Sequence, residues 1–552
     1  MIARRWSLGV ALSLGLSSGF SLVGCAGLFD KSPPPHVTCR SDLDCANTEV
    51  CFVDGCGDPG KNIAVEVTPS ARNGAYPQDF ALDGLKATQT FRLYAPSQLQ
   101  GALLRDQDSG GPLPYDGPVS LVLSGQSTII PGLSRHFEAT LNTAQTLATG
   151  TYSLAVGSGV YAISATPSDP LLPPLFEASH EVTPGQSEHI DLVFPSTGAL
   201  AQLSGTVVRS LGQPSSDALQ IQAFDPDGAP RSQPAVLGSD GSFTLSVTQE
   251  TLALQSLNLR VSPVDPQALL PTKIFPVAPV DPLAPLELGD FGAPLTLTSK
   301  VVDGSGKAIS GAAVHLEGSV IGGGTFQSAV ALTADDGTFQ LQTLASATPG
   351  SLVLFAVPPA TSASGILVDQ TLAVDGLTPL PVTLVCPDKV QLTGSVLTPD
   401  STPAVGVKVT AVPVAALDPK NLSAPLPSAG GDATTDGTGA FSLLLDPGQY
   451  RLDFVPSTKL PRLSRFVDVT PDDAQTPGNS LVEVPPFTLS HGRSATGHVE
   501  ILAADGNTAD VAALARVRFY RQVDNGDTPS SVLLDQAYAD ANGDFTVLLP
   551  TR

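Results

Sequence analysis

Charge and aromatic rings are scarce in this chain of 552 residues. Only 14% of the residues are charged and 5% are aromatic, and the single Trp is Trp6. Acidic residues outnumber basic ones by 52 to 28, for a formal net charge of −24. A surface this acidic repels phosphate backbones, so we expect no nucleic-acid partner. The shortage of aromatic rings also argues against a typical sugar-binding platform.

The motifs of common catalytic sites are missing as well. Among seven His, none forms the His-Glu-x-x-His helix of metal enzymes. Gly157-Ser158-Gly159 lacks the frame of a nucleophile elbow, and Gly322-Gly323-Gly324 precedes Thr-Phe rather than the Lys-Ser of a phosphate loop. His180 and His189 are expected to be solvated side chains rather than metal ligands. We therefore predict a protein that is not an enzyme and uses no cofactor and no metal.

Long helices are disfavoured by the distribution of Gly and Pro. The chain has 52 Gly and 50 Pro, yet 42% of it is hydrophobic. It is too apolar to be disordered throughout and too often interrupted to form long helices. At roughly 100–200 residues per domain, the length indicates several modules, so we expect an all-β protein with several cores.

The N-terminus has the features of an export leader, assigned to residues 1–24. Arg4 and Arg5 supply a positive n-region, and the apolar stretch that follows is too short to be a good permanent membrane span. Leu22-Val23-Gly24-Cys25 then resembles the lipobox of bacterial lipoproteins. The resemblance implies lipidation of Cys25 and a membrane anchor in the cell envelope, and Ala26 favours the outer membrane. The alternative is a plain secretory leader in which Cys25 is not lipidated.

A Pro-rich tether, residues 25–38, leads to four closely spaced cysteines. Outside the cytoplasm such a cluster indicates two disulfides that staple a segment too small for its own core, assigned to residues 39–60. The residues are Cys39, Cys45, Cys51 and Cys56, and three connectivities remain open. A zinc site is the alternative, although spacers of five, five and four residues contain no Cys-x-x-Cys pair. The remaining Cys386 lies in an apolar setting and is expected to be buried and inert.

Beyond residue 60 a pattern recurs at intervals of about 95 to 105 residues, the size of one immunoglobulin-like or transthyretin-like sandwich. Each unit opens with an alternating strand, which usually contains a Gly. A later turn leads into an aromatic residue, and Asp-Gly or Asn-Gly there supplies the positive φ of a tight two-residue turn. These turns are Asp240-Gly241-Ser242-Phe243, Asp336-Gly337-Thr338-Phe339, Gly439-Ala440-Phe441 and Asn542-Gly543-Asp544-Phe545. The aromatic ring is expected to return to the core.

Together these features resemble the carboxypeptidase regulatory-like domain and the related B-type repeats of surface adhesins. The resemblance covers most of residues 90–552 and implies tandem small Greek-key sandwiches, but it does not indicate a ligand. The predicted sandwiches span 61–196, 197–293, 294–386, 387–490 and 491–552. The last unit lacks its closing strands before Arg552, so either the sequence is truncated or this unit pairs with another strand.

These inferences predict a lipid-anchored, rod-like protein of the cell envelope, without catalysis. It would act as a spacer, an adhesin or an interaction scaffold, with the membrane and an envelope protein or glycan as partners. A carbohydrate- or peptide-binding lipoprotein of an uptake or envelope assembly is the alternative. A third reading is an accessory part of a hydrolase.

Overall fold

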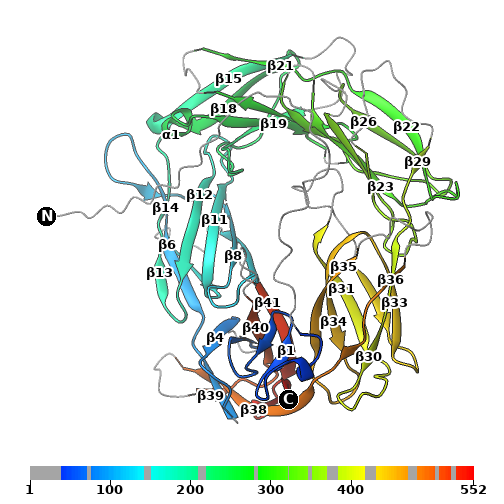
Figure 1. The fold of residues 1–552 in the computed structure, drawn as a ribbon. Helices are drawn as coiled ribbons and strands as arrows, with labels where there is room; N and C mark the ends of the chain where they lie inside the picture. Colours follow the sequence, from blue (N-terminus) through cyan, green and yellow to red (C-terminus); the bar gives the residue numbers. More distant parts are fainter. Residues whose placement is uncertain are drawn as a thin grey trace, which may run out of the picture. The chain divides into compact units, whose positions relative to one another are not determined.

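The computed structural model is almost entirely β-structure (Figure 1). It describes residues 39–552 except 71–75, 87, 142–150, 209–218, 266, 279–283, 321–322, 346–350, 370–382, 417–429, 470–480, 504–508 and 524–529. The only α-helix in these ranges is the short α1 (Gln249–Leu252), and no described helix is long and apolar enough to cross a membrane. The predicted all-β class is confirmed. The predicted leader, Cys25 and the tether 25–38 lie outside the described residues.

Residues 97–194 form a sandwich of two sheets. One sheet contains β6 (Ser97–Arg105), β7 (Leu113–Pro114), β10 (Thr151–Val156), β13 (Ser187–His189) and β14 (Leu192–Phe194). The other has the order β12 (Leu175–Val182), β11 (Gly159–Pro167), β8 (Val119–Gln126), β9 (Ser134–Leu141). The first strand, β6, pairs antiparallel with β10 and parallel with the closing strands β13 and β14. We call this unit sandwich 1.

Sandwich 4, residues 390–489, has the same plan. Its sheets are β33 (Ala440–Leu445), β30 (Val390–Leu397), β36 (Leu481–Glu483) and β37 (Phe487–Thr488), and β32 (Gly431–Thr434), β31 (Lys408–Ala416), β34 (Gly448–Val455), β35 (Leu463–Val469). Again the first strand, β30, pairs antiparallel with the strand after the turn and parallel with the closing strands. The side chain of Tyr450 is fully buried, and its hydroxyl donates to the Asp446 carbonyl at 2.9 Å.

Sandwiches 2 and 3, residues 200–290 and 295–385, are joined by a continuous sheet, which the sequence analysis did not predict. Sandwich 2 contributes β15 (Leu200–Val208), β16 (Leu219–Phe224), β17 (Ala235–Val236), β18 (Ser242–Thr248), β19 (Leu257–Pro263), β20 (Thr272–Val277) and β21 (Leu286–Asp290). Sandwich 3 contributes β22 (Leu295–Val302), β23 (Ala313–Ser319), β24 (Thr325–Gln327), β25 (Ala331–Leu332), β26 (Thr338–Thr343), β27 (Leu352–Val357), β28 (Leu367–Asp369) and β29 (Leu384–Val385).

The seam of this continuous sheet is the antiparallel pairing of β20 with β24. It produces one nine-stranded sheet in the order β17-β16-β19-β20-β24-β23-β27-β28, with β25 on β23. One hydrophobic core then runs from Leu203 in sandwich 2 to Cys386 after sandwich 3. The expectation of two separate cores at 197–293 and 294–386 is therefore corrected: the edge strands pair with each other instead of facing water.

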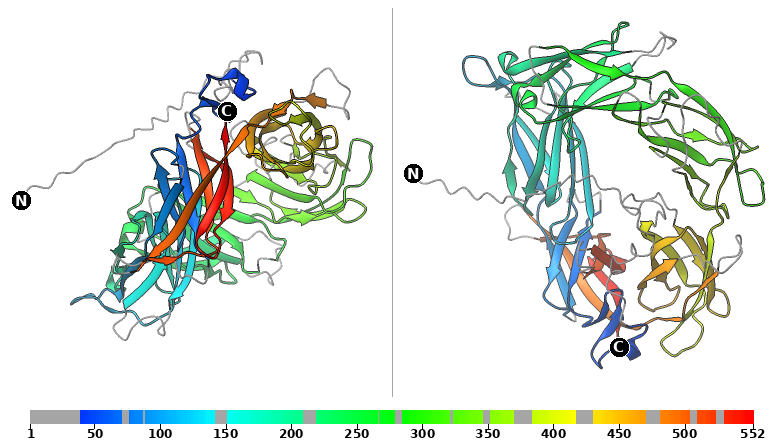
Figure 2. Two further views of the ribbon diagram at one scale, coloured as in Figure 1. Left: turned by 90° about the horizontal axis from the view of Figure 1, so that it is seen from below. Right: turned by 45° about the horizontal axis from the view of Figure 1, so that its top comes forward.

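The last sandwich is completed by strands from the other end of the chain (Figure 2). Its C-terminal strands are β38 (His491–Leu502), β39 (Ala509–Val511), β40 (Arg516–Val523), β41 (Ser530–Tyr538) and β42 (Asp544–Thr551). Its N-terminal strands are β3 (Ile63–Thr68), β4 (Gln78–Leu82) and β5 (Thr88–Leu93). One sheet has the order β4-β3-β40-β41, and in the other β5 pairs parallel with β38. We call this unit the composite sandwich.

Strand by strand, the composite sandwich matches sandwich 4 with its chain order rotated. The sheet β41-β40-β3-β4 corresponds to β32-β31-β34-β35, and β5 occupies the parallel closing position that β37 holds on β30. The assignment of residues 61–93 to the first sandwich is therefore corrected. Of the two alternatives for the incomplete unit, the structure shows pairing with another strand.

The turn and aromatic signals lie where the sequence placed them. Gly241, Gly337, Gly439 and Gly543 have φ of 80°, 80°, 78° and 80°. The four Phe side chains that follow these glycines are each 4% exposed. The turn before Phe243 is one residue longer than predicted. Gly238 N donates to Ser242 O, so the loop between them has three residues rather than two. It is a type I turn that ends with a Gly in the left-handed conformation.

Candidate functional site: the junction of the two chain ends

The cystine segment that precedes β3 contains two disulfides. Cys39 is bonded to Cys51 and Cys45 to Cys56, which is the connectivity that the sequence left open. The segment holds the one-turn helix η1 (Asp42–Asp44) and the hairpin of β1 (Val50–Phe52) and β2 (Gly55–Gly57). Because all four sulfurs are in disulfides, none is a thiolate able to bind zinc.

Arg465 of β35 attaches this segment to sandwich 4. Its side chain donates to the carbonyl of Cys51 at 3.0 Å and to that of Ser464 at 2.8 Å. The residue is only 3% exposed, and burial lowers the pKa of its guanidinium to about 10, against the attraction of Asp42 and Asp54. A buried cation that meets carbonyl oxygens rather than carboxylates fixes the position of the backbone that supplies them.

Two further arginines attach the segment to the composite sandwich. Arg521 of β40 pairs with Asp54 at 2.9 Å and lies over the Phe52 ring at 3.9 Å from its centroid. Arg552 donates to the carbonyl of Cys45 at 2.6 Å. Cationic side chains from the C-terminal part of the chain therefore hold the first segment that the structure describes. Such charge-assisted hydrogen bonds are the stronger ones in proteins.

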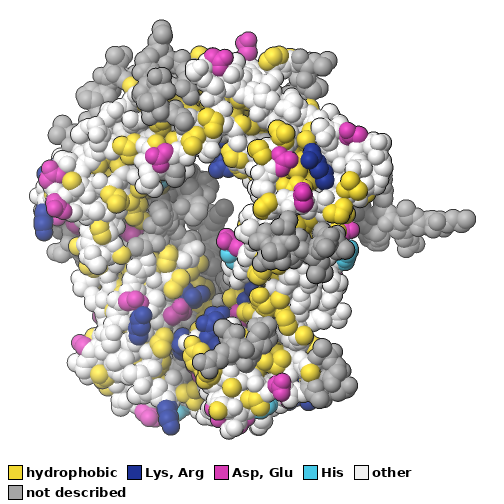
Figure 3. All heavy atoms as spheres, turned by 180° about the vertical axis from the view of Figure 1, so that it is seen from behind, with side chains coloured by type: hydrophobic (Ala, Val, Ile, Leu, Met, Phe, Trp, Pro, Cys, Tyr) yellow, Lys and Arg dark blue, Asp and Glu magenta, His cyan; other side chains and the backbone are white. Residues whose placement is uncertain are grey.

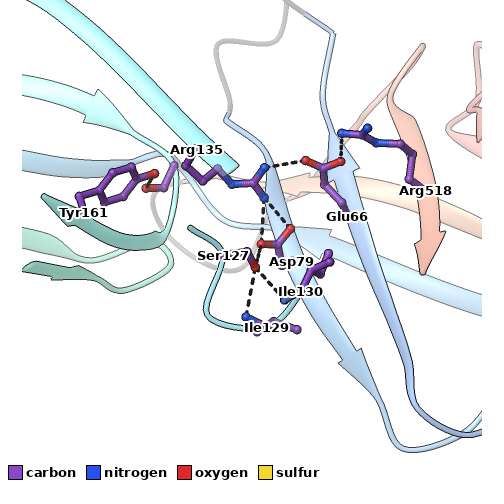
Figure 4. Close-up of polar contacts among 9 residues, drawn as sticks. Glu66, Asp79, Ser127, Ile129, Ile130, Arg135, Tyr161 and Arg518 are labelled. Atoms are coloured by element: carbon purple, nitrogen blue, oxygen red, sulfur yellow. Dashed lines mark hydrogen bonds and ion pairs between the residues drawn. The ribbon is translucent and has the colours of Figure 1, made fainter. Parts of the chain in front are cut away.

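A second ionic cluster, which we call the clasp, joins the composite sandwich to sandwich 1 (Figure 4). Arg135 at the start of β9 contacts Glu66 of β3 at 2.7 Å and Asp79 of β4 at 2.7 Å. Glu66 also pairs with Arg518 of β40, and Ser127 donates to Asp79 at 2.5 Å. The side chains of Glu66, Asp79 and Arg135 are 1%, 4% and 10% exposed, so water screens these charges little.

Burial and pairing act against each other in the clasp. Burial raises the pKa of Asp79, while Arg135 and the Ser127 hydroxyl favour its charged form. Burial by itself would lower the pKa of Arg135, but Asp79 and Glu66 outweigh it and the pKa is raised. The guanidinium is therefore charged, and the two carboxylates depend on it for compensation.

Other residues singled out in the sequence do not assemble into a site. His180 contacts Glu177 at 3.2 Å and His189 contacts Asp191 at 3.1 Å, so the two His do not share a partner. Cys386 is a buried free thiol, as expected, and burial raises its pKa to about 12.

The sequence analysis missed one catalytic-looking arrangement. Ser124, His136 and Glu138 form a hydrogen-bonded chain, with Ser124 Oγ 3.2 Å from His136 Nδ1 and His136 Nε2 2.9 Å from Glu138 Oε1. The His and Glu side chains are 57% and 67% exposed on the β8–β9 face. An open position of this kind does not exclude water, which weakens the electrostatic interactions that acyl transfer needs.

The arginines of the junction were missed too, although a signal was available. Arg516, Arg518 and Arg521 lie close together in a chain with only 28 basic residues. On the face in Figure 3, acidic and basic side chains are sparse and interspersed among uncharged atoms.

No protein-family model matches this chain, and no curated protein matches it. Among solved structures, a streptococcal ancillary pilin shares 12% identity over 51% of this chain and 98% of its own, with a TM-score of 0.19. BcpA, the major pilin subunit of Bacillus cereus, shares 9% identity over 52% of this chain and 99% of its own, with a TM-score of 0.14. Two B repeat units of the collagen-binding protein of Staphylococcus aureus share 8% identity over 71% of this chain and 99% of their own, with a TM-score of 0.13. At these scores the similarities carry no argument, and the strand pairing itself defines the fold.

Proposed function

We propose that this protein is a non-catalytic scaffold of the bacterial cell envelope, anchored by a lipid on Cys25 and presenting sandwich surfaces to envelope partners. The observation that carries the proposal is the composite sandwich, in which β5 pairs with β38 across some 408 residues of sequence. This pairing closes the series of sandwiches along the chain. Because of this closure, the sandwiches do not form the rod-like string that was predicted from the sequence.

Closure suits a tethered scaffold for a physical reason. A tether on Cys25 would pull first on the cystine segment, which is held by Arg465, Arg521 and Arg552. Force between the two chain ends would then load the composite sandwich, because sandwiches 1 to 4 lie between its two halves in sequence. Those four sandwiches would stay folded and keep their surfaces available.

The anchor is tested by replacing Cys25 with Ser. The protein with the wild-type sequence should fractionate with membranes and resist extraction by high salt, because several acyl chains give an effectively permanent attachment. The Cys25→Ser variant should appear in the soluble fraction, whereas a Cys386→Ser control should fractionate as the wild-type protein does. Retention of the Cys25→Ser variant on membranes would reject the lipid anchor.

The closed scaffold is tested with a protease site inserted between Pro195 and Ser196, where sandwich 1 ends. After cleavage, the two fragments should elute together in native size exclusion and separate only in denaturant. In a variant with a second site between Leu489 and Ser490, residues 196–489 are held to the remainder by side-chain contacts such as Arg465 with Cys51 rather than by strand pairing, so they should be released at a lower denaturant concentration than the fragments of the single cut. If the fragments separate after the single cut, the sandwiches are connected only along the chain and the closed scaffold is wrong.

A further inference from the structure

The continuous sheet of sandwiches 2 and 3 carries a hollow of about 600 Å³ at its seam, lined by both polar and apolar groups. Side chains from β16, β19, β20, β24, β23 and β27 line it, so it spans six adjacent strands. At about 4.8 Å between strands, the lining is roughly 24 Å long. Neither sandwich alone presents this surface, since the two halves of the lining meet only through the pairing of β20 with β24.

The strand register arranges the polar side chains of the hollow in two transverse rows. One row passes through Thr272, Gln327, Glu317 and Val353, which are successive partners across the strands. The other row passes through Gln222, Arg260, Ile274 and Thr325. Each row therefore crosses four of the six strands and places one side chain on each of those four, at an even spacing.

The floor of the hollow is formed where β24 closely approaches β20. Gly324 has φ of 83°, and an added Cβ would lie 2.2 Å from the Ile274 carbonyl, so only Gly lets β24 approach β20 this closely. Below the seam, Lys273 is fully buried and donates to the Asp290 carbonyl at 2.6 Å. Phe326, its register partner, is 3% exposed and fills the core.

The lining selects against charged and peptide ligands. Within the described residues neither Arg260 nor Glu317 has an ion-pair partner, and the two lie three strands, roughly 14 Å, apart. One cation and one anion cancel, so the hollow has no net attraction for a polyanion. Every strand involved has a neighbour on both sides, which leaves no free backbone edge for an extended peptide. The apolar side chains Ile274 and Val353 are separated by polar residues of the lining, so they form no continuous apolar stripe for an amphipathic helix.

What remains is a ligand rich in hydroxyl groups. Amide and hydroxyl side chains both donate and accept hydrogen bonds, as sugar hydroxyls do. Gln220, Gln222, Gln327, Ser262 and Thr325 supply these groups, and Gln220 Nε2 already lies 3.4 Å from Ser262 Oγ. Gln222 Nε2 donates to the Ser232 carbonyl at 2.9 Å, so Gln222 offers a ligand its Oε1 and its second N–H. Ile274 and Val353 add apolar contact for the C–H faces of sugar rings.

We infer that this hollow is a binding site for a neutral, extended oligosaccharide, held by the two side-chain rows across the seam. Hydrogen bonds, rather than stacking on an aromatic platform, supply the affinity. The site does not depend on the lipid anchor or on the composite sandwich, so it stands apart from the proposed scaffold function.

The test is calorimetric titration of the purified protein with cellohexaose, mannohexaose, chitohexaose and, as an anionic comparison, hexagalacturonic acid. At least one neutral hexasaccharide should bind, and the double variant Gln222→Ala/Gln327→Ala should bind it about tenfold or more weakly, since the hydrogen bonds of two amides are lost. The matched control Gln340→Ala/Gln391→Ala, with both residues exposed on other sheets, should bind as the unmodified protein does.

Circular dichroism checks the fold of each variant, and Thr325→Ala, at an exposed position, serves if the double variant does not fold. Three results would overturn the proposal: no binding of any neutral hexasaccharide, binding of the galacturonate alone, or an unchanged affinity in the lining variants.

Discussion

At the scale of single residues, several of the few basic side chains are buried. Lys273, Arg465 and Arg521 are 0%, 3% and 5% exposed. Removing such groups from water costs free energy, which carbonyls, carboxylates and aromatic rings offset only in part. This burial could not be predicted from the sequence, because Lys and Arg side chains are mostly exposed in proteins.

Replacing Lys273 with Met tests this cost. We expect the variant to be as stable as the unmodified protein at pH 7, or more stable by about 1 kcal/mol. Met fills a similar volume and removes the desolvation of a cation, although the Asp290 carbonyl loses a donor. Thermal unfolding measures the difference, and a large loss of stability would show that the ammonium group is required.

The same pair of proteins should show a pH dependence of known sign. Burial lowers the pKa of Lys273 from 10.5, so the folded state releases the proton more readily than the unfolded state. Stability of the unmodified protein then rises with pH between the folded pKa and 10.5. Relative to Lys273→Met it should improve as the pH approaches 10.5. A difference that stays constant would contradict a charged, buried Lys273.

The clasp makes a prediction with a matched control. Arg135→Met should destabilise the protein by about 3–5 kcal/mol, because Asp79 would remain buried without a cationic partner and Glu66 would keep only Arg518. The midpoint of the affected thermal transition should fall by roughly 10 °C or more. Arg92→Met removes an ion pair with Glu500 in which the Arg side chain is 67% exposed, and should cost under about 1 kcal/mol. Equal effects of the two substitutions would show that the clasp stabilises the protein no more than an exposed ion pair.

At the scale of elements, the sequence predicted strands, turns and core aromatics well because these signals are local. A left-handed Gly followed two residues later by Phe needs only the chain's own geometry. The Gly of the opening strand has a less local reason. An added Cβ at Gly497 would lie 2.3 Å from the Phe545 ring and 2.5 Å from the Gln89 carbonyl, so this Gly makes room both for the core Phe and for a strand that arrives from the N-terminal part of the chain.

The seam between sandwiches 2 and 3 can be tested with two neighbouring glycines. Gly323 and Gly324 have φ of 88° and 83°, so Val is strained at both positions. Only Gly324 also faces the Ile274 carbonyl, whereas nothing lies within 4 Å of a Cβ at Gly323.

Gly324→Val should therefore be less stable than Gly323→Val by a further ~1–3 kcal/mol, with faster hydrogen exchange in β20 and β24. Thermal unfolding and amide exchange measure both. Two variants that behave alike would mean that β24 does not approach β20 as described.

At the scale of the whole molecule, the sequence could not predict which strands complete which sandwich. β5 ends three residues before β6 begins, and this proximity suggested a single domain. Its true partners lie about 400 residues away, and Phe91 stacks on Phe545 at 5.8 Å between ring centroids. Hydrophobic patterns specify that a strand is buried, but they do not name the strand beside it. The junction arginines and the hollow at the seam depend on these pairings and were missed for the same reason.

Closure over such a distance has a consequence for folding. Long-range pairing must pay the entropy of closing a long loop before its contacts form, so the composite sandwich is expected to form after sandwiches 1 to 4. Those units have most of their partners nearby in sequence and can fold first.

The pairing of β5 with β38 is the central claim, and a single cross-link tests it most directly. Thr88 and Thr496 are register partners whose hydroxyl oxygens lie 3.5 Å apart, near opposite ends of the chain. In Thr88→Cys/Thr496→Cys, peptide mass spectrometry of the monomer should find a disulfide between residues 88 and 496, and none in a Thr88→Cys/Ser442→Cys control. If both new cysteines of the first variant remain free thiols in the folded monomer, the composite sandwich and the closed scaffold built on it are wrong.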